Sequence, residues 1–198
     1  MGERIGIFGG TFDPIHVGHL VAAINAKHAV GLNRVVLMVA NVPWQKAEVR
    51  VVSSAEDRLA LVEAAVGDVP GLEAGSLEIE RGGVSYTADT LAAMKEAAPQ
   101  DELFLILGWD AAGELQSWDR HEEVKALATL VVVNRPGSGR PAALDADGWR
   151  VVEVTVPNLE ISSTDLRARA ADGRPLDYLI PEAAVHCIRL RRMYAGGG

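Results

Sequence analysis

The residues best suited to chemistry lie together near the start of the chain. A twelve-residue stretch, GGTFDPIHVGHL, directly follows a short apolar run, RIGIF. His16 and His19 are three residues apart, so on a helix or at its entry turn they project from one face. Gly9 and Gly10 let the backbone turn tightly and approach a ligand, and Gly18 leaves space beside the histidines. A phosphate fits such a place, facing a helix N-terminus and two imidazole donors.

The common nucleotide-binding loops and a metal site fit this stretch less well than a phosphate site does. The chain has no GxxxxGK[ST] sequence and so no Walker A loop, and GIFGGTFD lacks the GxGxxG spacing of dinucleotide-binding folds. Asn41 stands where those folds carry the acid that binds the ribose. Paired imidazoles could bind a metal, but no third ligand stands at a metal-like spacing. One histidine could also start a helix while the other lies in the core. The glycines beside both favour a phosphate site.

A second candidate segment, ISSTDLR, lies near the C-terminus. Arg167 follows Thr164 by three residues and Ser163 by four, so one helical face can present two hydroxyls and a guanidinium group to a phosphate. Taken alone, the segment would fit better as a Ser/Thr helix cap with a solvated arginine.

The elements that must position these residues follow from the apolar pattern. Short β-branched runs alternate with longer segments of helical period, which predicts βαβ units and a parallel sheet. The expected strands are Arg4–Phe8, Arg34–Val39, Leu72–Glu80, Leu103–Leu107, Thr129–Val133 and Val151–Val156. The expected helices are Val17–Val30, Ala55–Val66, Thr87–Ala97, a short pair within Ala111–Ala128, Thr164–Ala171 and Pro181–Tyr194. The fold class is therefore α/β, a doubly wound Rossmann-like parallel sheet with a small C-terminal helical portion.

Several ends of these expected helices carry capping signals. Ser53 with Glu56 forms a capping box before the second helix. Gly31 and Gly173 stand at C-cap positions, and Pro181 suits a first helical turn.

Composition narrows the class of protein. We expect one domain over residues 1–198, because 198 residues with 48% hydrophobic and 23% charged residues are typical of a single globular domain. The formal net charge of −8 argues against binding to nucleic acid or to an anionic membrane. A single cysteine, Cys187, excludes an internal disulfide, and neither a signal peptide nor a run long enough to span a bilayer is found. These features predict a location in the cytoplasm.

The two segments together resemble a known superfamily. GTFDPIHVGH is similar to the HxGH signature of the nucleotidylyltransferases, and ISSTDLR to their SxTxxR signature, which lies at a helix start and binds the outgoing phosphates of ATP. Over essentially the whole chain the sequence most resembles the bacterial nicotinate-nucleotide adenylyltransferases, which join nicotinate mononucleotide and ATP to give deamido-NAD and pyrophosphate. The resemblance implies that family's nucleotidylyltransferase fold and its requirement for Mg²⁺.

The resemblance also assigns roles to individual residues. The implied catalytic residues are His16, His19 and Arg167. Those implied to bind ATP are Gly9, Gly10, Thr11, Phe12, Gly18, Gly108, Asp110, Ile161, Ser162, Ser163 and Thr164. Those implied to bind nicotinate mononucleotide are Asn41, Lys46, Ser85, Tyr86, Thr87, Trp118 and Arg135. No residue is assigned to a metal. Many family members carry a histidine where this chain has Gln45, and Trp44 is bulkier than usual, which leaves Lys46 as the main expected contact for the pyridine nucleotide's phosphate.

Several alternative functions remain open. Pantetheine-phosphate adenylyltransferases, cytidylyltransferases and nicotinamide-nucleotide adenylyltransferases share the superfamily. The first two would not account for SYTADTL, which resembles the nicotinate-contacting segment of the nicotinate-nucleotide adenylyltransferases, together with SWD, which resembles the segment that carries their stacking tryptophan. A non-catalytic nucleotide-binding module would bind ATP without turnover, and the intact His16, His19 and Arg167 argue against it. Self-association into a homo-oligomer is left open.

Overall fold

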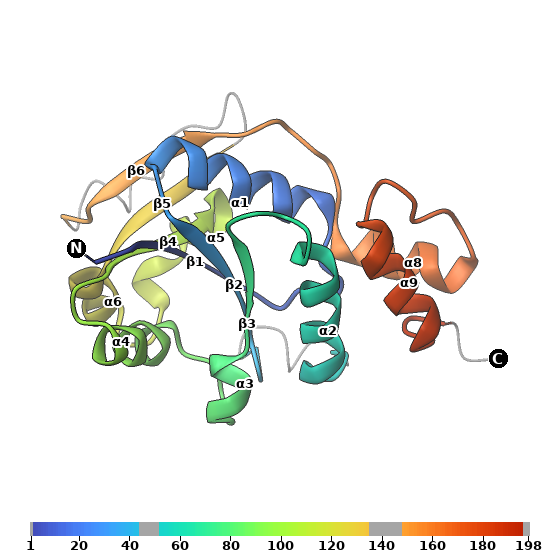
Figure 1. Cartoon of the computed structure of the whole chain (residues 1–198), viewed down its shortest axis with the longest axis horizontal. Helices are drawn as coiled ribbons and strands as arrows, with labels where there is room; N and C mark the ends of the chain where they lie inside the picture. Colours follow the sequence, from blue (N-terminus) through green and yellow to red (C-terminus); the bar gives the residue numbers. More distant parts are fainter. Residues whose placement is uncertain (1, 44–51, 135–147, 196–198) are drawn as a thin grey trace.

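A six-stranded parallel sheet forms the centre of the molecule (Figure 1). The computed structural model of the chain describes residues 2–43, 52–134 and 148–195. The strands are β1 (Arg4–Gly10), β2 (Arg34–Val39), β3 (Leu72–Gly75), β4 (Glu102–Gly108), β5 (Ala128–Asn134) and β6 (Val151–Thr155). Their spatial order is β3-β2-β1-β4-β5-β6, and every pair is parallel. The expected doubly wound sheet is confirmed, with its change of direction between β1 and β4.

Helices cover both faces of this sheet. They are α1 (Val17–Val30), α2 (Ala55–Val66), α3 (Leu77–Arg81), α4 (Thr87–Ala97), α5 (Trp109–Gly113), the 3₁₀ turn η1 (Leu115–Ser117), α6 (His121–Leu127), α8 (Ser163–Asp172) and α9 (Glu182–Leu190). Buried residues of α1, α2, α8 and α9 form one apolar cluster with the sheet, and those of α4, α5, η1 and α6 form a second. The inner strands β2, β4 and β5 are buried on both faces along most of their length, as parallel strands covered on both sides must be, whereas β3 and β6 at the sheet edges carry exposed residues.

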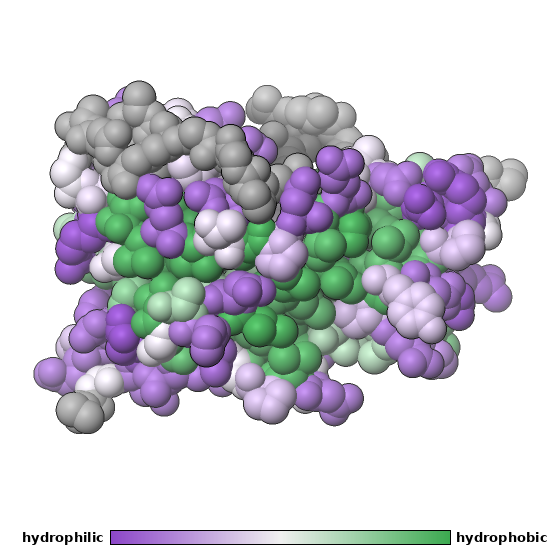
Figure 2. All heavy atoms as spheres, turned by 90° about the horizontal axis from the view of Figure 1, so that it is seen from above, coloured by the Kyte–Doolittle hydropathy of each residue, from purple (hydrophilic) through white to green (hydrophobic). Residues whose placement is uncertain are grey.

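Helix α1 packs on the sheet through small buried side chains. Ala22, Ala23 and Ala26 face the core, whereas Ile24 is 44% exposed. Figure 2 views the molecule from above relative to Figure 1 and shows hydrophobic residues gathered in the middle of this upper face between hydrophilic ones. Within the described residues, no helix is long and apolar enough to cross a bilayer.

Several boundaries differ from those that the sequence predicts. The third strand ends at Gly75 rather than Glu80, because the chain turns at Ser76, whose carbonyl accepts the Ile79 and Glu80 amides and starts α3. The alternating pattern of LEIER therefore belongs to a short helix. The short pair of helices predicted within Ala111–Ala128 is present as α5 and α6, but α5 begins two residues earlier, at Trp109, and η1 lies between the two helices.

Some of the predicted helix caps are confirmed and others are shifted by one residue. Gly31 and Gly173 are C-caps with left-handed φ of 66° and 72°, as predicted. The N-cap of α2 is Ser54 rather than Ser53, since the Ser54 hydroxyl accepts the Asp57 amide at 3.1 Å. Pro181 is likewise the N-cap of α9 and not its first residue.

Helix α9 is also shorter than predicted and ends at Leu190. The chain then turns, and the Tyr194 hydroxyl donates to the Asp13 carboxylate at 2.7 Å. This bond ties the C-terminal part of the chain to the loop after β1. Burial, and then the Asp13 charge, raise the pKa of Tyr194, so its hydroxyl stays a donor.

Candidate functional site

Three neighbouring cavities open at the carboxyl ends of the strands, where β1 and β4 diverge. The Trp118 cavity is lined by Gly9, Gly10, Thr11, Ala40, Pro43, Glu78, Ser85, Thr87, Leu105, Leu107, Ala111 and Trp118. The Arg167 cavity is lined by residues 8–13, 106–108 and 161–164 together with His16, His19, Asp110, Ala111 and Arg167. The Asn134 cavity is lined by Phe8, His16, Gly18, His19, residues 108–110, Val133, Asn134, Val156, Pro157, Leu159 and Ile161.

The Arg167 cavity connects the other two. It shares residues 9–11 with the Trp118 cavity, and it shares His16, His19 and Gly108 with the Asn134 cavity. Its volume of about 590 Å³ lies within the range of small-molecule sites. Crevices at this point of an open α/β sheet are the usual ligand sites of doubly wound folds.

The glycines of the first motif provide space rather than a turn. Gly9 and Gly10 belong to β1 and neither has a positive φ, so the tight turn predicted for them is wrong. A Cβ on Gly9 would meet no atom within 4 Å, so this position leaves the cavity wall open. A Cβ on Gly10 would lie 2.7 Å from the Phe12 ring, and one on Gly18 would lie 3.0 Å from His16 Nδ1. Gly108, at the end of β4, leaves the facing wall open in the same way.

The two histidines do lie on one face, at the entry to α1. His16 is the N-cap and His19 occupies the third helical position, where its Nδ1 accepts the His16 backbone amide at 3.2 Å. The rings stack with centroids 3.7 Å apart and an interplanar angle of 28°. His16 is 8% exposed, and its Nδ1 is buried without a partner in the described part of the chain. Desolvation lowers the pKa of His16 to about 4, so the ring is neutral at pH 7.

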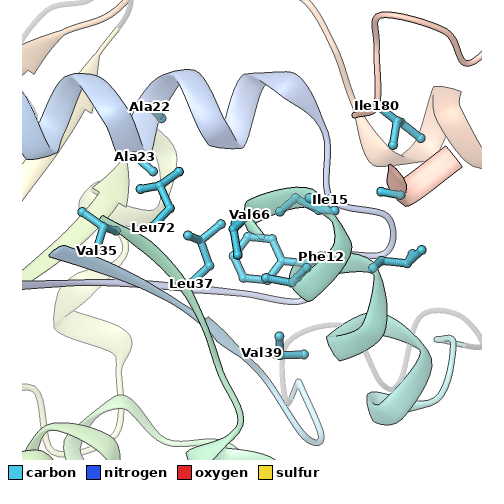
Figure 3. Close-up of a cluster of buried hydrophobic side chains, with 14 of the residues drawn as sticks. Phe12, Ile15, Ala22, Ala23, Val35, Leu37, Val39, Val66, Leu72 and Ile180 are labelled. Carbon is cyan, nitrogen blue, oxygen red and sulfur yellow. The ribbon is translucent and has the colours of Figure 1, made fainter. Parts of the chain in front are cut away.

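Apolar residues between the glycines and the histidines hold the loop to the core. Phe12 is 3% exposed and Ile15 is fully buried, and both pack against β2, α2 and the C-terminal segment (Figure 3). The Phe12 ring meets the His19 ring edge-on at 5.1 Å. Although Phe12 is expected at the nucleotide and lines the Arg167 cavity, its ring packs in the core and orients His19.

The ISSTDLR segment lies across the Arg167 cavity from the glycines, at the start of α8. Ser162 is the N-cap and accepts the Asp165 amide at 3.1 Å. Arg167 donates to the Asp13 carbonyl oxygen at 2.7 Å and to the Thr164 hydroxyl at 3.2 Å. Because the Thr164 oxygen accepts from Arg167, its own proton remains available to a ligand.

Ser163 behaves differently from Thr164. Its hydroxyl donates to the Pro14 carbonyl oxygen at 2.9 Å, which fastens α8 to the loop after β1. A phosphate bound here would therefore receive the proton of the Thr164 hydroxyl, while Ser163 serves as an anchor.

The Trp118 cavity gathers several of the residues expected at the pyridine nucleotide. Ser85, Thr87 and Trp118 line it, and Trp118 Nε1 is a buried donor without a partner among the described residues. Tyr86 does not line the cavity. It is the N-cap of α4, and the Arg120 guanidinium carbon lies 5.9 Å from the centre of its ring.

The remaining expected residues fall into two groups. Asn41 does not line the Trp118 cavity; its side chain donates to the Gly83 carbonyl at 2.9 Å and its backbone amide to the Ser85 hydroxyl at 2.8 Å. Asp110 and Ile161 line both the Arg167 and the Asn134 cavities, as expected. Lys46 and Arg135, together with Trp44 and Gln45, lie outside the described residues.

Three residues at the site were not expected from the sequence. Arg58 on α2 is 1% exposed, and its guanidinium reaches the loops after β1 and β2. The sequence does contain a signal for Arg58, because helical spacing places this charged residue on the same apolar face of α2 as Leu61, Val62 and Ala65. Glu78 lines the Trp118 cavity and accepts a hydrogen bond from the Thr90 hydroxyl at 2.7 Å. The sequence analysis did not identify Glu78 because it placed residues 72–80 in a strand. Asn134, at the end of β5, has a buried side-chain oxygen without a partner in the described chain.

Two carboxylates line the Arg167 cavity. Among the described residues, no group of three or more histidine, cysteine or acidic side chains could hold a metal ion. Asp13 and Asp110 line the Arg167 cavity, and Asp13 is 1% exposed and bonded to Tyr194. Asp110 is exposed and so remains accessible to a hydrated cation.

Comparison with known proteins places these features in a family. The cytidylyltransferase-like family model matches residues 7–169. A protein of Corynebacterium kroppenstedtii is 43% identical over 98% of this chain and 92% of its own length, and one of Streptomyces coelicolor is 43% identical over 95% and 99%. Both carry the name "probable nicotinate-nucleotide adenylyltransferase".

A solved structure shares the fold at low sequence identity. Plasmodium falciparum nicotinic acid mononucleotide adenylyltransferase, complexed with NaAD, superposes with a TM-score of 0.78 and 18% identity, over 97% of each chain.

Proposed function

The chain belongs to the cytidylyltransferase-like family and to the nicotinate-nucleotide adenylyltransferases within it, and from this we propose that it transfers the adenylyl group of ATP to nicotinate mononucleotide. The products are deamido-NAD and pyrophosphate, in a step of NAD biosynthesis. The observation that supports this proposal most is the row of three connected cavities. The Arg167 cavity in the middle carries residues 9–11, which it shares with the Trp118 cavity, and His16 and His19, which it shares with the Asn134 cavity. Two nucleotide spaces would therefore meet at a cavity lined by donors for phosphate groups.

We place ATP in the Asn134 and Arg167 cavities. The unpaired Asn134 oxygen is an acceptor, which suits the exocyclic amine of adenine and not the carbonyl of guanine. Asp110 lines the passage between the two cavities, where the ribose would lie. Thr164 and Arg167, at the N-terminus of the ten-residue helix α8, would bind the departing pyrophosphate.

We place nicotinate mononucleotide in the Trp118 cavity, with its ring on Trp118. The first-turn amides of α4 have no partner within the helix and stand at the positive end of its dipole, which favours a carboxylate. Glu78 lines the same cavity and opposes a second carboxylate, although its hydrogen bond from Thr90 holds one oxygen away from the ligand. Preference for the acid over the amide therefore depends on the amides of Tyr86 and Thr87. Lys46 and Arg135 remain expected contacts for this nucleotide.

For this reaction the protein must align the two reacting phosphates and neutralise their negative charge. A phosphate monoester has a second pKa near 6, so at neutral pH the attacking phosphate is already mostly a dianion and needs no general base. The protein must hold this oxygen in line with the α-phosphorus of ATP and stabilise the charge that develops on the phosphoryl oxygens. His16 and His19 are placed for the second task, and a neutral His16 still donates one N–H.

Mg²⁺ is the cofactor we expect. When bound to the triphosphate it would neutralise part of the phosphate charge. Asp110 is the described carboxylate that could meet it, directly or through water, in the Arg167 cavity.

Pyrophosphate release across a panel of acceptors tests the proposal. We expect release with Mg-ATP plus nicotinate mononucleotide, and little with pantetheine phosphate, with GTP in place of ATP, or without an acceptor. ATP binding without any pyrophosphate release would instead support a non-catalytic module. A cytoplasmic location is a further expectation, to be checked by cell fractionation. Sedimentation would decide whether the chain self-associates.

A further inference from the structure

Arg58 is a charged side chain enclosed in the apolar face of α2. It is 1% exposed, and its neighbours on that face, Leu61 and Val62, are fully buried. Burying an ionised group costs free energy unless hydrogen bonds compensate for its lost hydration. A hydrocarbon side chain would fill the same volume at lower cost, so the reason for an arginine here must lie in the hydrogen bonds it makes.

Those bonds go to four backbone carbonyls. The Nε atom donates to the Ser53 oxygen at 2.9 Å, one terminal nitrogen donates to Thr11 at 2.9 Å and to Ala40 at 2.6 Å, and the other donates to Asn41 at 2.9 Å. The planar fork of a guanidinium group has donors in these directions, whereas an ammonium group offers donors from one point only.

The bonded carbonyls belong to the loops that carry both halves of the site. Thr11 follows β1 and lines both the Trp118 and the Arg167 cavities. Ala40 and Asn41 follow β2, and Ala40 also lines the Trp118 cavity. Asn41 then holds residues 83–85 through its amide and side chain, next to the start of α4. Arg58 thus joins the walls of the two nucleotide spaces at the point where the spaces meet.

We propose that Arg58 is a positioning residue that fixes the loop after β1 against the loop after β2 and so sets the alignment of the two reacting phosphates. It touches neither substrate and acts through backbone carbonyls. This inference rests on the proposed adenylyl transfer. A misplacement of about 1 Å at such a site costs on the order of 10² in rate, so the expected effect is on kcat.

The test compares Arg58→Lys with Leu61→Ala. Leu61 lies on the same buried face of α2, and its hydrocarbon side chain makes no hydrogen bond. Its truncation therefore destabilises the fold while leaving the four carbonyl contacts of Arg58 in place. We expect Arg58→Lys to lose at least about tenfold in kcat while calorimetry still shows one ATP bound per chain with a similar Kd. Leu61→Ala should keep its kcat. Arg58→Gln, which retains two N–H donors, replaces the lysine variant if the latter does not fold.

Amide hydrogen exchange provides a readout independent of turnover. The Asn41 amide donates to the Ser85 hydroxyl and the Ser85 amide to the Val42 carbonyl, so both should exchange faster in Arg58→Lys and not in Leu61→Ala. Unchanged exchange, or looser loops with an unchanged kcat, would overturn the proposal. If the wild-type chain transfers nothing to nicotinate mononucleotide, the proposed function fails, while the exchange rates still decide whether Arg58 fixes the loops.

Discussion

The buried, neutral imidazole of His16 makes a quantitative prediction about stability. Its pKa falls from an ordinary 6.5 to about 4 in the folded protein because burial removes the hydration of the charged form. Between these two pH values the unfolded chain binds a proton at this site and the folded chain does not. The stabilising effect is therefore fully present above pH 6.5 and is lost as the pH falls toward 4.

The size of the effect follows from the shift in pKa. One unit corresponds to about 1.36 kcal/mol, so the full shift corresponds to roughly 3 kcal/mol once the pH is below 4. At pH 5, where the folded protein still leaves His16 neutral, the loss relative to pH 7 is about 2 kcal/mol. Such a loss is a large fraction of the stability of an ordinary domain.

Urea unfolding at pH 7 and pH 5 measures this loss, with His16→Gln as the matched variant. The glutamine does not titrate, and all other groups contribute equally to both proteins. We expect the wild type to lose about 2 kcal/mol more than His16→Gln between the two pH values. If both proteins lose the same free energy of unfolding, His16 is not a buried neutral base, and the description of the histidine pair is wrong.

Three further predictions concern catalysis and substrate choice. His19→Ala should bind ATP almost normally but lose on the order of 10² to 10³ in kcat, since it removes one preorganised donor, and a near-normal kcat would exclude His19 from the mechanism. Arg167→Lys keeps the charge but loses the two-pronged contact, so its kcat/KM should fall, and that of Arg167→Ala should fall further; normal kinetics in both would make ISSTDLR only a capped helix. Nicotinate mononucleotide should exceed nicotinamide mononucleotide by about 10² in kcat/KM, because a carboxylate accepts from the α4 amides where an amide NH₂ meets them donor to donor. Equal values would remove Tyr86 and Thr87 from the recognition of the substituent.

Much of the fold could be predicted from the sequence because local pattern and tertiary structure agree. The strand Arg34–Val39 and the helices Val17–Val30 and Ala55–Val66 end where predicted, since apolar runs, helical period and glycine caps all indicate the same boundaries. The strand predicted over Leu77–Glu80 was wrong because the alternating residues of this segment also fit one turn of helix. Contacts outside the segment favour the helix, namely those of the Ser76 carbonyl and of Glu78 with Thr90.

The part of the candidate site that the two sequence motifs form could be predicted from the sequence. His16, His19 and Arg167 line one cavity, as their two motifs suggested. The sequence could not show which of the expected side chains make contacts within the protein instead of facing a ligand. Ser163, Phe12 and Asn41 hold backbone or neighbouring rings in place. Contacts between segments distant in the sequence, such as that of Arg58 with Thr11, leave only the weak local signal of a charge on an apolar helical face.

The fate of a radioactive label tests the central claim most directly. The chain, Mg²⁺ and nicotinate mononucleotide are incubated with ATP labelled with ³²P at either the α- or the γ-phosphorus, and the products are separated and identified by mass spectrometry. Adenylyl transfer predicts that the α-label enters deamido-NAD, that the γ-label leaves in pyrophosphate, and that neither product forms without the acceptor. Transfer of the γ-label to the acceptor, or no labelled dinucleotide from the α-labelled ATP, would contradict the account.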